Sequence, residues 1–209
     1  MQFWSDSFRD GGAIPAKFAF CAIDPDTHVR WSANKNPHLG WRDLPAGTRS
    51  LAIICHDPDV PSSAEHVNQD GKRVPASLPR GDFFHWTLID LPPDMLAITE
   101  GEASDGVTAR GKAGPEALRG GRQGLNDYSG WFAADPDMCG EYFGYDGPCP
   151  PWNDAIIHHY IFTLYALDIA HLPLTGPFTA AQVLAALQGH ILAQASITGQ
   201  YTLNPELAA

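Results

Sequence analysis

Glycine and proline set the first limit on how this chain can fold. They number 20 and 18 among 209 residues, and they are spread along most of the sequence. Both residue types interrupt helices, so the chain should have many turns and few long helices. Residues 101–155 hold 11 of the glycines and show neither a helical nor a strand period. We expect this region to form loops that fold over one end of a β core.

Several apolar segments rich in β-branched and aromatic residues predict strands between these turns. The clearest are Arg49–His56, Phe83–Leu91 and His158–Asp168, and Ala16–Ile23 is a fourth candidate. Strands joined by turn-rich loops are typical of a β-sandwich. At this length the simplest organisation is a single domain over residues 1–209.

One helix is predicted near the C-terminus. Thr179 is a favourable N-cap, and Gln182 three residues later completes a capping box. Apolar residues then recur at helical spacing from Val183 to Leu192. We expect the helix to leave through Gly199 into a final strand at Gln200–Leu203.

Charge and hydropathy exclude some classes of partner. The net charge is −11, which disfavours binding to nucleic acid or to an anionic membrane by bulk electrostatics. No apolar run approaches the ~18 residues that a membrane helix needs, so we expect no stable membrane insertion. The N-terminus lacks the pattern of a signal peptide, which predicts a cytoplasmic protein.

The four cysteines show no CxxC pair, so neither a zinc ribbon nor a thioredoxin-type site is supported. Cys21 and Cys55 lie within strand-like segments, where we interpret them as small buried apolar residues. These observations predict a protein with reduced cysteines.

Polar residues occur where predicted strands meet loops. In Ser50–Pro61 an apolar strand runs into Asp57 and Asp59, and the adjacent prolines should stop the strand and hold Asp57 extended. Taken alone, this segment is more often a surface turn. The triplet Asp-Pro-Asp also occurs at residues 24–26 and 135–137, so spacing alone does not identify a functional copy.

Two histidines lie at comparable positions. His85 is near the start of one strand, and His158 begins another, with Tyr160 on the same face because side chains alternate along a strand. Each histidine alone is more often a core or surface residue than a ligand-binding one. The sequence does not show that they converge. It contains no P-loop, Rossmann, GxSxG or HExxH motif, so no nucleotide cofactor or acyl-transfer triad is indicated.

Five motifs in order resemble the phosphatidylethanolamine-binding protein (PEBP) family, in its bacterial Raf-kinase-inhibitor-like branch. They are DPDVP at 57–61, FFHWTLIDLP at 83–92, GYDGPCPP at 144–151, HHYIFTLYALD at 158–168 and GHILAQASITGQY at 189–201. The resemblance covers roughly residues 12–204. It implies a sandwich of two antiparallel sheets with a C-terminal helix and long covering loops.

The resemblance also implies an anion-binding pocket for a phosphate-like group or a phospholipid head group. It implies no catalytic residue, cofactor or metal. Two departures affect the pocket mouth: Arg80 stands about where many eukaryotic members have a tyrosine, and residues 62–82 form a larger insertion than small members possess. The ligand-binding residues carried over from the family are Asp57, Asp59, Pro61, His85, Gly147, Pro148, His158 and Tyr160.

Function is therefore expected to be the binding of a phosphoethanolamine-like ligand, with Asp57 orienting or charging His85 or His158. On this hypothesis anion affinity rises at mildly acid pH. Replacing His158 by alanine should then abolish binding and leave the thermal midpoint nearly unchanged. Further expectations are a protein partner such as a kinase or protease at the pocket rim, and a homodimer like those of bacterial members. The alternatives are a metal-assisted hydrolase using His85, His158 and Asp57, and an interaction module with a vestigial pocket.

Overall fold

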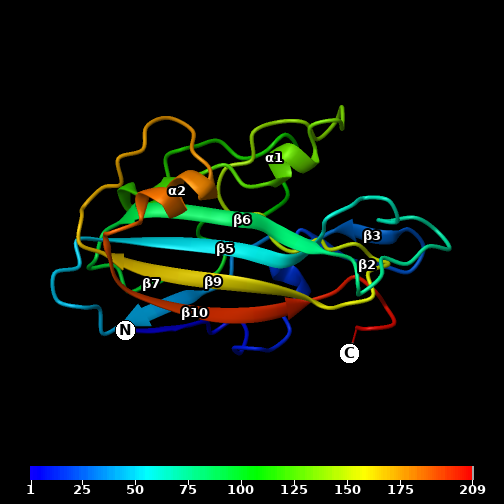
Figure 1. Cartoon of the computed structure of the whole chain (residues 1–209), viewed down its shortest axis with the longest axis horizontal. Helices are drawn as coiled ribbons and strands as arrows, with labels where there is room; N and C mark the ends of the chain where they lie inside the picture. The colour runs from blue at the N-terminus through cyan, green and yellow to red at the C-terminus, as the bar shows by residue number, and fades with distance from the viewer. Residues whose placement is uncertain (209) are drawn as a thin grey trace.

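The computed structural model describes residues 1–208 and consists mainly of antiparallel strands (Figure 1). Regular helix is confined to short segments between the strands. The helices are η1 (Ala16–Phe18), η2 (Leu118–Gly120), α1 (Tyr128–Trp131) and α2 (Ala180–Ala186). The strands are β1 (Gln2–Trp4), β2 (Cys21–Asp24), β3 (His28–Trp31), β4 (Leu39–Arg42), β5 (Ser50–Pro61), β6 (Arg80–Leu91), β7 (Ala97–Ile98), β8 (Arg122–Gln123), β9 (His158–Leu167) and β10 (Ile191–Tyr201).

The central sheet has five strands in the order β10-β9-β5-β6-β8, and β5, β6 and β9 form its middle. A three-stranded sheet, β1-β4-β7, makes the second layer, and its apolar residues share one core with the central sheet. On the opposite face of the central sheet, Val183 of α2 and Leu187, which directly follows the helix, pack against residues of β5 and β6. The mainly β, antiparallel architecture that the sequence predicted is confirmed.

A third, two-stranded sheet was not predicted. The hairpin β2-β3 projects beyond one end of the central sheet, on the right in Figure 1. The predicted strand Ala16–Ile23 is correct only in its second half. The first half is η1, which begins after Pro15, where the amide of Phe18 donates to the carbonyl of Pro15 at 2.9 Å.

The prediction that prolines stop the strand at Asp57 is wrong. β5 continues to Pro61 and still pairs with β6, because the register shifts between Asp57 and Val60. A β-bulge of this kind accommodates residues that cannot donate to a regular ladder. The acid therefore lies inside a long, bent strand rather than at its end.

The C-terminal helix is shorter than predicted. It begins at the expected cap, where the amide of Thr179 donates to Oε1 of Gln182 at 2.9 Å, but it ends at Ala186. Gly189 then has a φ of +84°, which reverses the chain and places Ile191 and Leu192 in β10. β10 begins earlier in the sequence than predicted because it pairs with β9 along almost its whole length.

The interpretation of Cys21 as a free apolar residue is also wrong. Cys21, the first residue of β2, forms a disulfide with Cys149 in the loop before β9. Cys55 is free and buried, as predicted, and Cys139 is free and exposed. The expectation that the cysteines are reduced is therefore wrong for Cys21 and Cys149.

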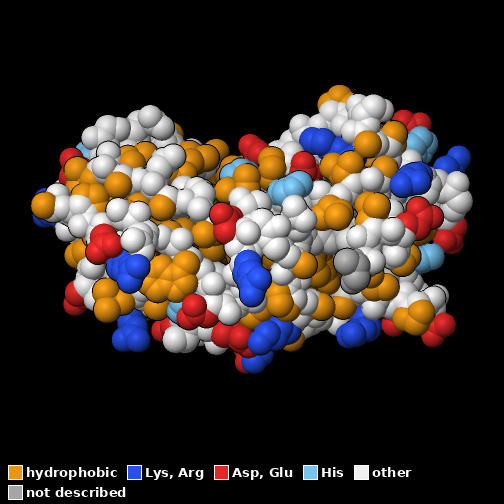
Figure 2. All heavy atoms as spheres, turned by 90° about the horizontal axis from the view of Figure 1, so that it is seen from below, with side chains coloured by type: hydrophobic (Ala, Val, Ile, Leu, Met, Phe, Trp, Pro, Cys, Tyr) orange, Lys and Arg blue, Asp and Glu red, His pale blue; other side chains and the backbone are white. Residues whose placement is uncertain are grey.

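Within residues 1–208, no helix has both the length and the hydropathy to cross a bilayer. On the face of the molecule shown in Figure 2, acidic and basic side chains are interspersed.

Candidate functional site

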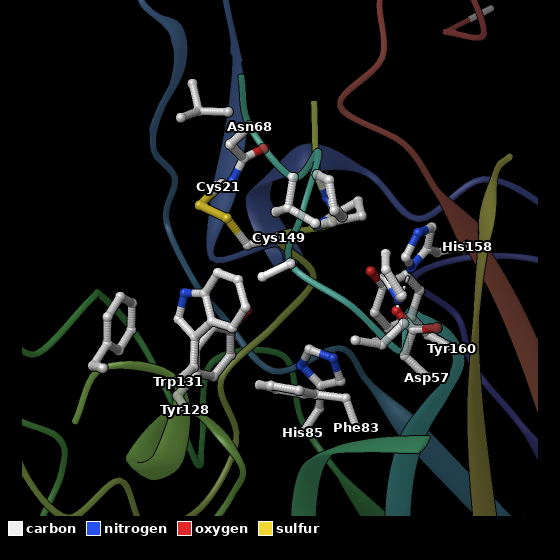
Figure 3. A pocket seen from close by; sticks show the side chains of 18 of the residues that line it. Cys21, Asp57, Asn68, Phe83, His85, Tyr128, Trp131, Cys149, His158 and Tyr160 are labelled. Atoms are coloured by element: carbon white, nitrogen blue, oxygen red, sulfur yellow. Dashed lines mark hydrogen bonds and ion pairs between the residues drawn. A yellow bond between two sulfur atoms is a disulfide. The ribbon is translucent and has the colours of Figure 1, made fainter. Parts of the chain in front are cut away.

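A pocket of about 230 Å³ lies at the end of the central sheet that faces the β2-β3 hairpin. Figure 3 shows Asp57, His158 and Tyr160 on one side of it, with His85 and Phe83 at its base. Tyr128 and Trp131 of α1 face them, and Asn68 lies with the disulfide at the opposite end. Segments far apart in the chain thus meet around one cavity.

Two irregularities in the pairing of β5 with β6 help to aim the polar side chains. Cys55 pairs with Trp86 but His56 pairs with Phe84, so His85 is an extra residue on β6. The second shift follows Asp57. Bulges bend a strand and redirect a side chain, which is why they often lie beside binding sites. The motifs DPDVP and FFHW therefore contribute strand geometry as well as polar groups.

His158 is completely buried between two carboxylates. Its Nδ1 lies 2.7 Å from Oδ2 of Asp57, and its Nε2 lies 3.1 Å from Oδ2 of Asp154. Both ring nitrogens donate only when the imidazole is protonated. Burial by itself lowers the pKa of His158, but the hydrogen bonds to Asp154 and Asp57 outweigh it and raise the pKa to about 9.

A further charged side chain, that of Arg80, joins this group of charges through Asp154. Arg80 binds Asp154 with both terminal nitrogens, at 2.6 and 3.0 Å. Burial would raise the pKa of Asp154, but the hydrogen bonds from His158 and Arg80 lower it overall. The chain Arg80–Asp154–His158–Asp57 alternates in sign and has no net charge. The pocket therefore offers no unpaired cation to a ligand at this side.

The imidazole of His85 is oriented by a hydrogen bond to a backbone carbonyl group on the side away from the pocket. Its Nδ1 lies 2.8 Å from the carbonyl oxygen of Asp146, so Nδ1 carries the hydrogen and Nε2 is left for the pocket. Aromatic rings of Phe83, Tyr128 and Tyr160 surround the imidazole. Burial lowers the pKa of His85, and the nearby charge of Asp57 only partly offsets this. His85 is thus neutral at pH 7, with a lone pair on Nε2.

Tyr160 has an unused hydroxyl. The side chain is 1% exposed, and its oxygen has no hydrogen-bond partner among residues 1–208. A buried, unpaired hydroxyl is costly to leave in a protein interior. Burial, followed by the charge of Asp57, raises the pKa of Tyr160 well above its ordinary value, so the group stays an O–H donor. Because Tyr160 lines the pocket, its hydroxyl is a candidate donor to a ligand.

The walls of the pocket are mostly apolar. Trp31 of β3 and Trp131 of α1 also line the pocket and remain 54% and 52% exposed. The disulfide forms part of the wall, since both of its cysteines line the cavity. The other apolar lining residues are Val29, Val60, Pro61, Ala64, Val67, Phe83, Tyr128, Phe132, Pro150 and Pro151.

The structure brings together five of the eight residues carried over from the family: Asp57, Pro61, His85, His158 and Tyr160 line the pocket.

The other three lie elsewhere. Asp59 turns outwards and accepts hydrogen bonds from the backbone N–H and Nδ1 of His159. Gly147 and Pro148 lie behind the wall. The Gly147 amide donates to Oδ1 of Asn34, and an added Cβ would stand 2.1 Å from the Phe18 carbonyl oxygen. The Gly147 amide is therefore not available to a ligand.

Several residues of the site were missed in the sequence. Asp154 belongs to none of the five motifs. Its role comes from its contact with His158, which lies four residues later in the chain. Asp146 lies within the motif GYDGPCPP, yet its buried carboxylate is bound by Asn34, Asn126 and Lys112 rather than by a ligand. Asp146 could have been noticed as part of a family motif, whereas Asp154 carried no local signal.

The same geometry tests the metal alternative. Within residues 1–208, no three His, Cys, Asp or Glu side chains are grouped so that they could hold a metal ion. Both nitrogens of His158 already bind carboxylates, which leaves no lone pair for a metal. The set His85, His158 and Asp57 does not fit a metal centre.

Comparison with known proteins agrees with the architecture. A family model described as phosphatidylethanolamine-binding protein matches residues 4–202. UPF0098 protein YbhB of Escherichia coli (strain K12) is 30% identical over 97% of this chain and 100% of its own length. A UPF0098 protein of Methanothermobacter thermautotrophicus is 31% identical over 96% of this chain and 98% of its own.

Two solved structures are similar along nearly the whole chain. The crystal structure of Escherichia coli YbcL, described as a new member of the mammalian PEBP family, has a TM-score of 0.67 and 25% identity, and covers 96% of this chain and 97% of that one. A putative PEBP homologue from Chlamydia trachomatis has a TM-score of 0.64 and 29% identity, with coverage of 96% and 95%.

Proposed function

The chain belongs to the phosphatidylethanolamine-binding protein family, and from this premise we propose that it binds a small ligand with a phosphate-like head group. The observation that supports this best is the unpartnered Tyr160 hydroxyl, buried beside the open Nε2 of His85 in an apolar pocket. The head group would occupy the polar part of the pocket formed by Asp57, His85 and Tyr160, which we call the floor. The apolar walls would contact the rest of the ligand, as in pockets with few, well-placed polar groups.

Asp57 has a supporting role in this proposal. One carboxylate oxygen accepts from His158 and the other from the backbone amide of Asp59 at 2.8 Å. A carboxylate held by two donors is less repulsive to a nearby anion. An ammonium group on the ligand, as in phosphoethanolamine, would pair with the same carboxylate. Asp57 is a binding and orienting acid in this account rather than a nucleophile.

The test is the substitution Tyr160→Phe, which removes only the unpartnered hydroxyl. Titration calorimetry with phosphoethanolamine should show affinity reduced about tenfold, the range expected for a hydrogen bond to a charged group. The thermal midpoint should not fall, because no protein hydrogen bond is lost. Tyr165→Phe on the same strand is the control, since Tyr165 packs on the opposite face of the sheet. Unchanged affinity in Tyr160→Phe would contradict the proposal.

Two secondary proposals concern partners. A protein partner, such as a kinase or protease, would bind at the pocket rim, where the exposed Trp31 and Trp131 offer the aromatic surface typical of interfaces. A homodimer rests on the family resemblance alone, and light scattering in solution tests it.

The disulfide supports a proposal about location. Disulfides persist in oxidising compartments and are rare in the cytosol. We therefore favour an oxidising compartment over the reduced cytoplasm for the folded protein. A count of free thiols in the unreduced protein tests the disulfide on which this inference rests.

A further inference from the structure

The loop of residues 62–79, between β5 and β6, forms the outer wall of the pocket. Ser63, Ala64, Val67 and Asn68 of this loop line the cavity near its mouth. Apart from an isolated bridge at Val74, the loop contains only turns and irregular backbone. Its shape therefore depends on contacts with the rest of the molecule.

Four hydrogen bonds from this loop converge on one side chain, Asn153. Its Nδ2 lies 2.8 Å from the carbonyl oxygen of His66, 3.1 Å from that of Lys72 and 3.3 Å from that of Gln69. Its Oδ1 accepts from the backbone amide of Asn68 at 3.0 Å. Asn153 is buried, so water does not readily replace these bonds. A single amide thus fixes four points spread over seven residues.

The neighbouring backbone strengthens the attachment. The amide of Trp152 donates to Oδ1 of Asn68 at 3.1 Å, and the amide of Val74 donates to the carbonyl of Asn153 at 3.0 Å. Asp154, the next residue, holds His158 at the pocket floor. Adjacent residues therefore position two different parts of the site: Asn153 the outer wall and Asp154 the floor.

We propose that Asn153 is a specificity-determining residue: by holding the loop 62–79, it places Ala64 and Val67 against the apolar part of the ligand. This inference rests on the proposed function and names the ligand class as phosphate monoesters with an apolar substituent. Asn153 acts through the loop and does not contact the head group, because it is absent from the pocket lining. The floor of Asp57, His85 and Tyr160 does not depend on it.

Two probes distinguish binding at the floor from binding at the outer wall. Inorganic phosphate reaches only the floor, and phenyl phosphate also contacts the wall. In Asn153→Ala, titration calorimetry should show about a tenfold loss of affinity for phenyl phosphate and less than a twofold change for phosphate. Asn153→Asp keeps the acceptor for Asn68 but turns a carboxylate oxygen towards three carbonyls, so it should behave like the alanine variant.

Gln69→Ala is the matched control. Gln69 lies in the same loop, is exposed, and its side chain bonds only the carbonyl of Glu65 within the loop. This variant should bind both probes like the wild type. Equal losses for the two probes in Asn153→Ala, or no loss for either, would overturn the proposal.

Limited digestion with trypsin measures the attachment of the loop independently of any ligand. Cleavage after Lys72 or Arg73, identified by mass spectrometry, should be several times faster in Asn153→Ala than in Gln69→Ala, and an unchanged rate would contradict the anchoring role. If the wild type binds neither probe, the proposed function is overturned and the specificity role with it. Faster cleavage in the variant would then support the anchoring role alone.

Discussion

His158 shows how the pocket depends on the pairing of buried charges at single residues. It lies between Asp57 and Asp154, and all three side chains are almost completely inaccessible. Removing one partner from such a group leaves another charge buried without compensation, which costs more than the pair contributes. The histidine therefore supports the fold as well as the site, because its two nitrogens are fully used by the protein.

The first prediction concerns His158→Ala. The sequence led to the expectation of an unchanged thermal midpoint, but the geometry predicts a loss of about 3–5 kcal/mol in the free energy of unfolding. Urea unfolding at pH 7 measures this loss. His159→Ala, next along the strand and partly exposed beside Asp59, should lose less than about 1 kcal/mol. A His158 variant as stable as this control would contradict the buried-charge account.

The second prediction concerns His85 and the pH dependence of binding. Burial keeps the pKa of His85 below its ordinary value, opposed by the charges of Asp57 and Asp146 and assisted by that of His158. Because the lone pair on Nε2 repels an anion, the imidazole must take up a proton from solvent when an anion binds. Affinity for sulfate, which keeps its charge over this range, should rise as pH falls from 8 to 5.5, by at most about tenfold per pH unit.

The matched variant for this prediction is His85→Gln, which cannot become charged. Its affinity for sulfate should be lower and should not vary with pH in the same interval. Wild-type affinity that stays flat over this range would show that His85 does not take up the proton.

The disulfide is the decisive feature at the scale of secondary-structure elements. β2 and β3 form a separate two-stranded hairpin, and such hairpins are marginally stable alone. Cys21 joins the hairpin to the loop at Cys149, 128 residues later in the chain. The hairpin also carries Trp31 to the pocket mouth. The disulfide therefore stabilises both the hairpin and one wall of the pocket.

The third prediction follows from this crosslink. Protein unfolded in denaturant without reductant should show two reactive thiols, Cys55 and Cys139, and four after reduction. Cys149→Ser should lower the free energy of unfolding by about 2–5 kcal/mol, as for loss of a native disulfide. Cys139→Ser, which removes an exposed free thiol, is the control. Four reactive thiols in unreduced protein would contradict both the disulfide and the proposed oxidising compartment.

The fourth prediction concerns the whole molecule and its stability against pH. The folded pKa of His158 is about 9, above its unfolded value, so its contribution is complete below about pH 6.5 and is lost as pH rises to 9. The folded pKa of His85 is lowered, so its burial costs stability as pH falls below about 6.5. The two effects place the stability maximum near pH 6.5.

Urea unfolding from pH 5 to 9.5 measures this curve. The alkaline decline should approach about 1.4 kcal/mol per pH unit between pH 7 and 8.5. The variant His158→Leu should lose that decline while remaining less stable at neutral pH. A wild-type curve that is level from pH 6.5 to 9 would contradict the charged state of His158.

The sequence by itself determined the β character of this protein and most of its strands. Segments such as Phe83–Leu91 and His158–Asp168 carry enough apolar and β-branched residues to be recognised locally. Family motifs identified five residues that line the pocket. Local patterns failed where pairing with a distant strand overrides them: β5 continues through the prolines of DPDVP, and Ile191 joins β10 instead of a helix.

Only the tertiary structure decided how the charged residues pair and which of them face the ligand. Asp154 carries no local signal, and its pairing with Arg80 is not apparent from the sequence. The bond between Cys21 and Cys149 spans most of the chain. Asp57 and Asp59 look equivalent in the sequence, yet one binds His158 inside the pocket and the other binds His159 outside it. The physical reason is that burial and hydrogen-bond partners are set by contacts between segments distant in sequence, which no local pattern records.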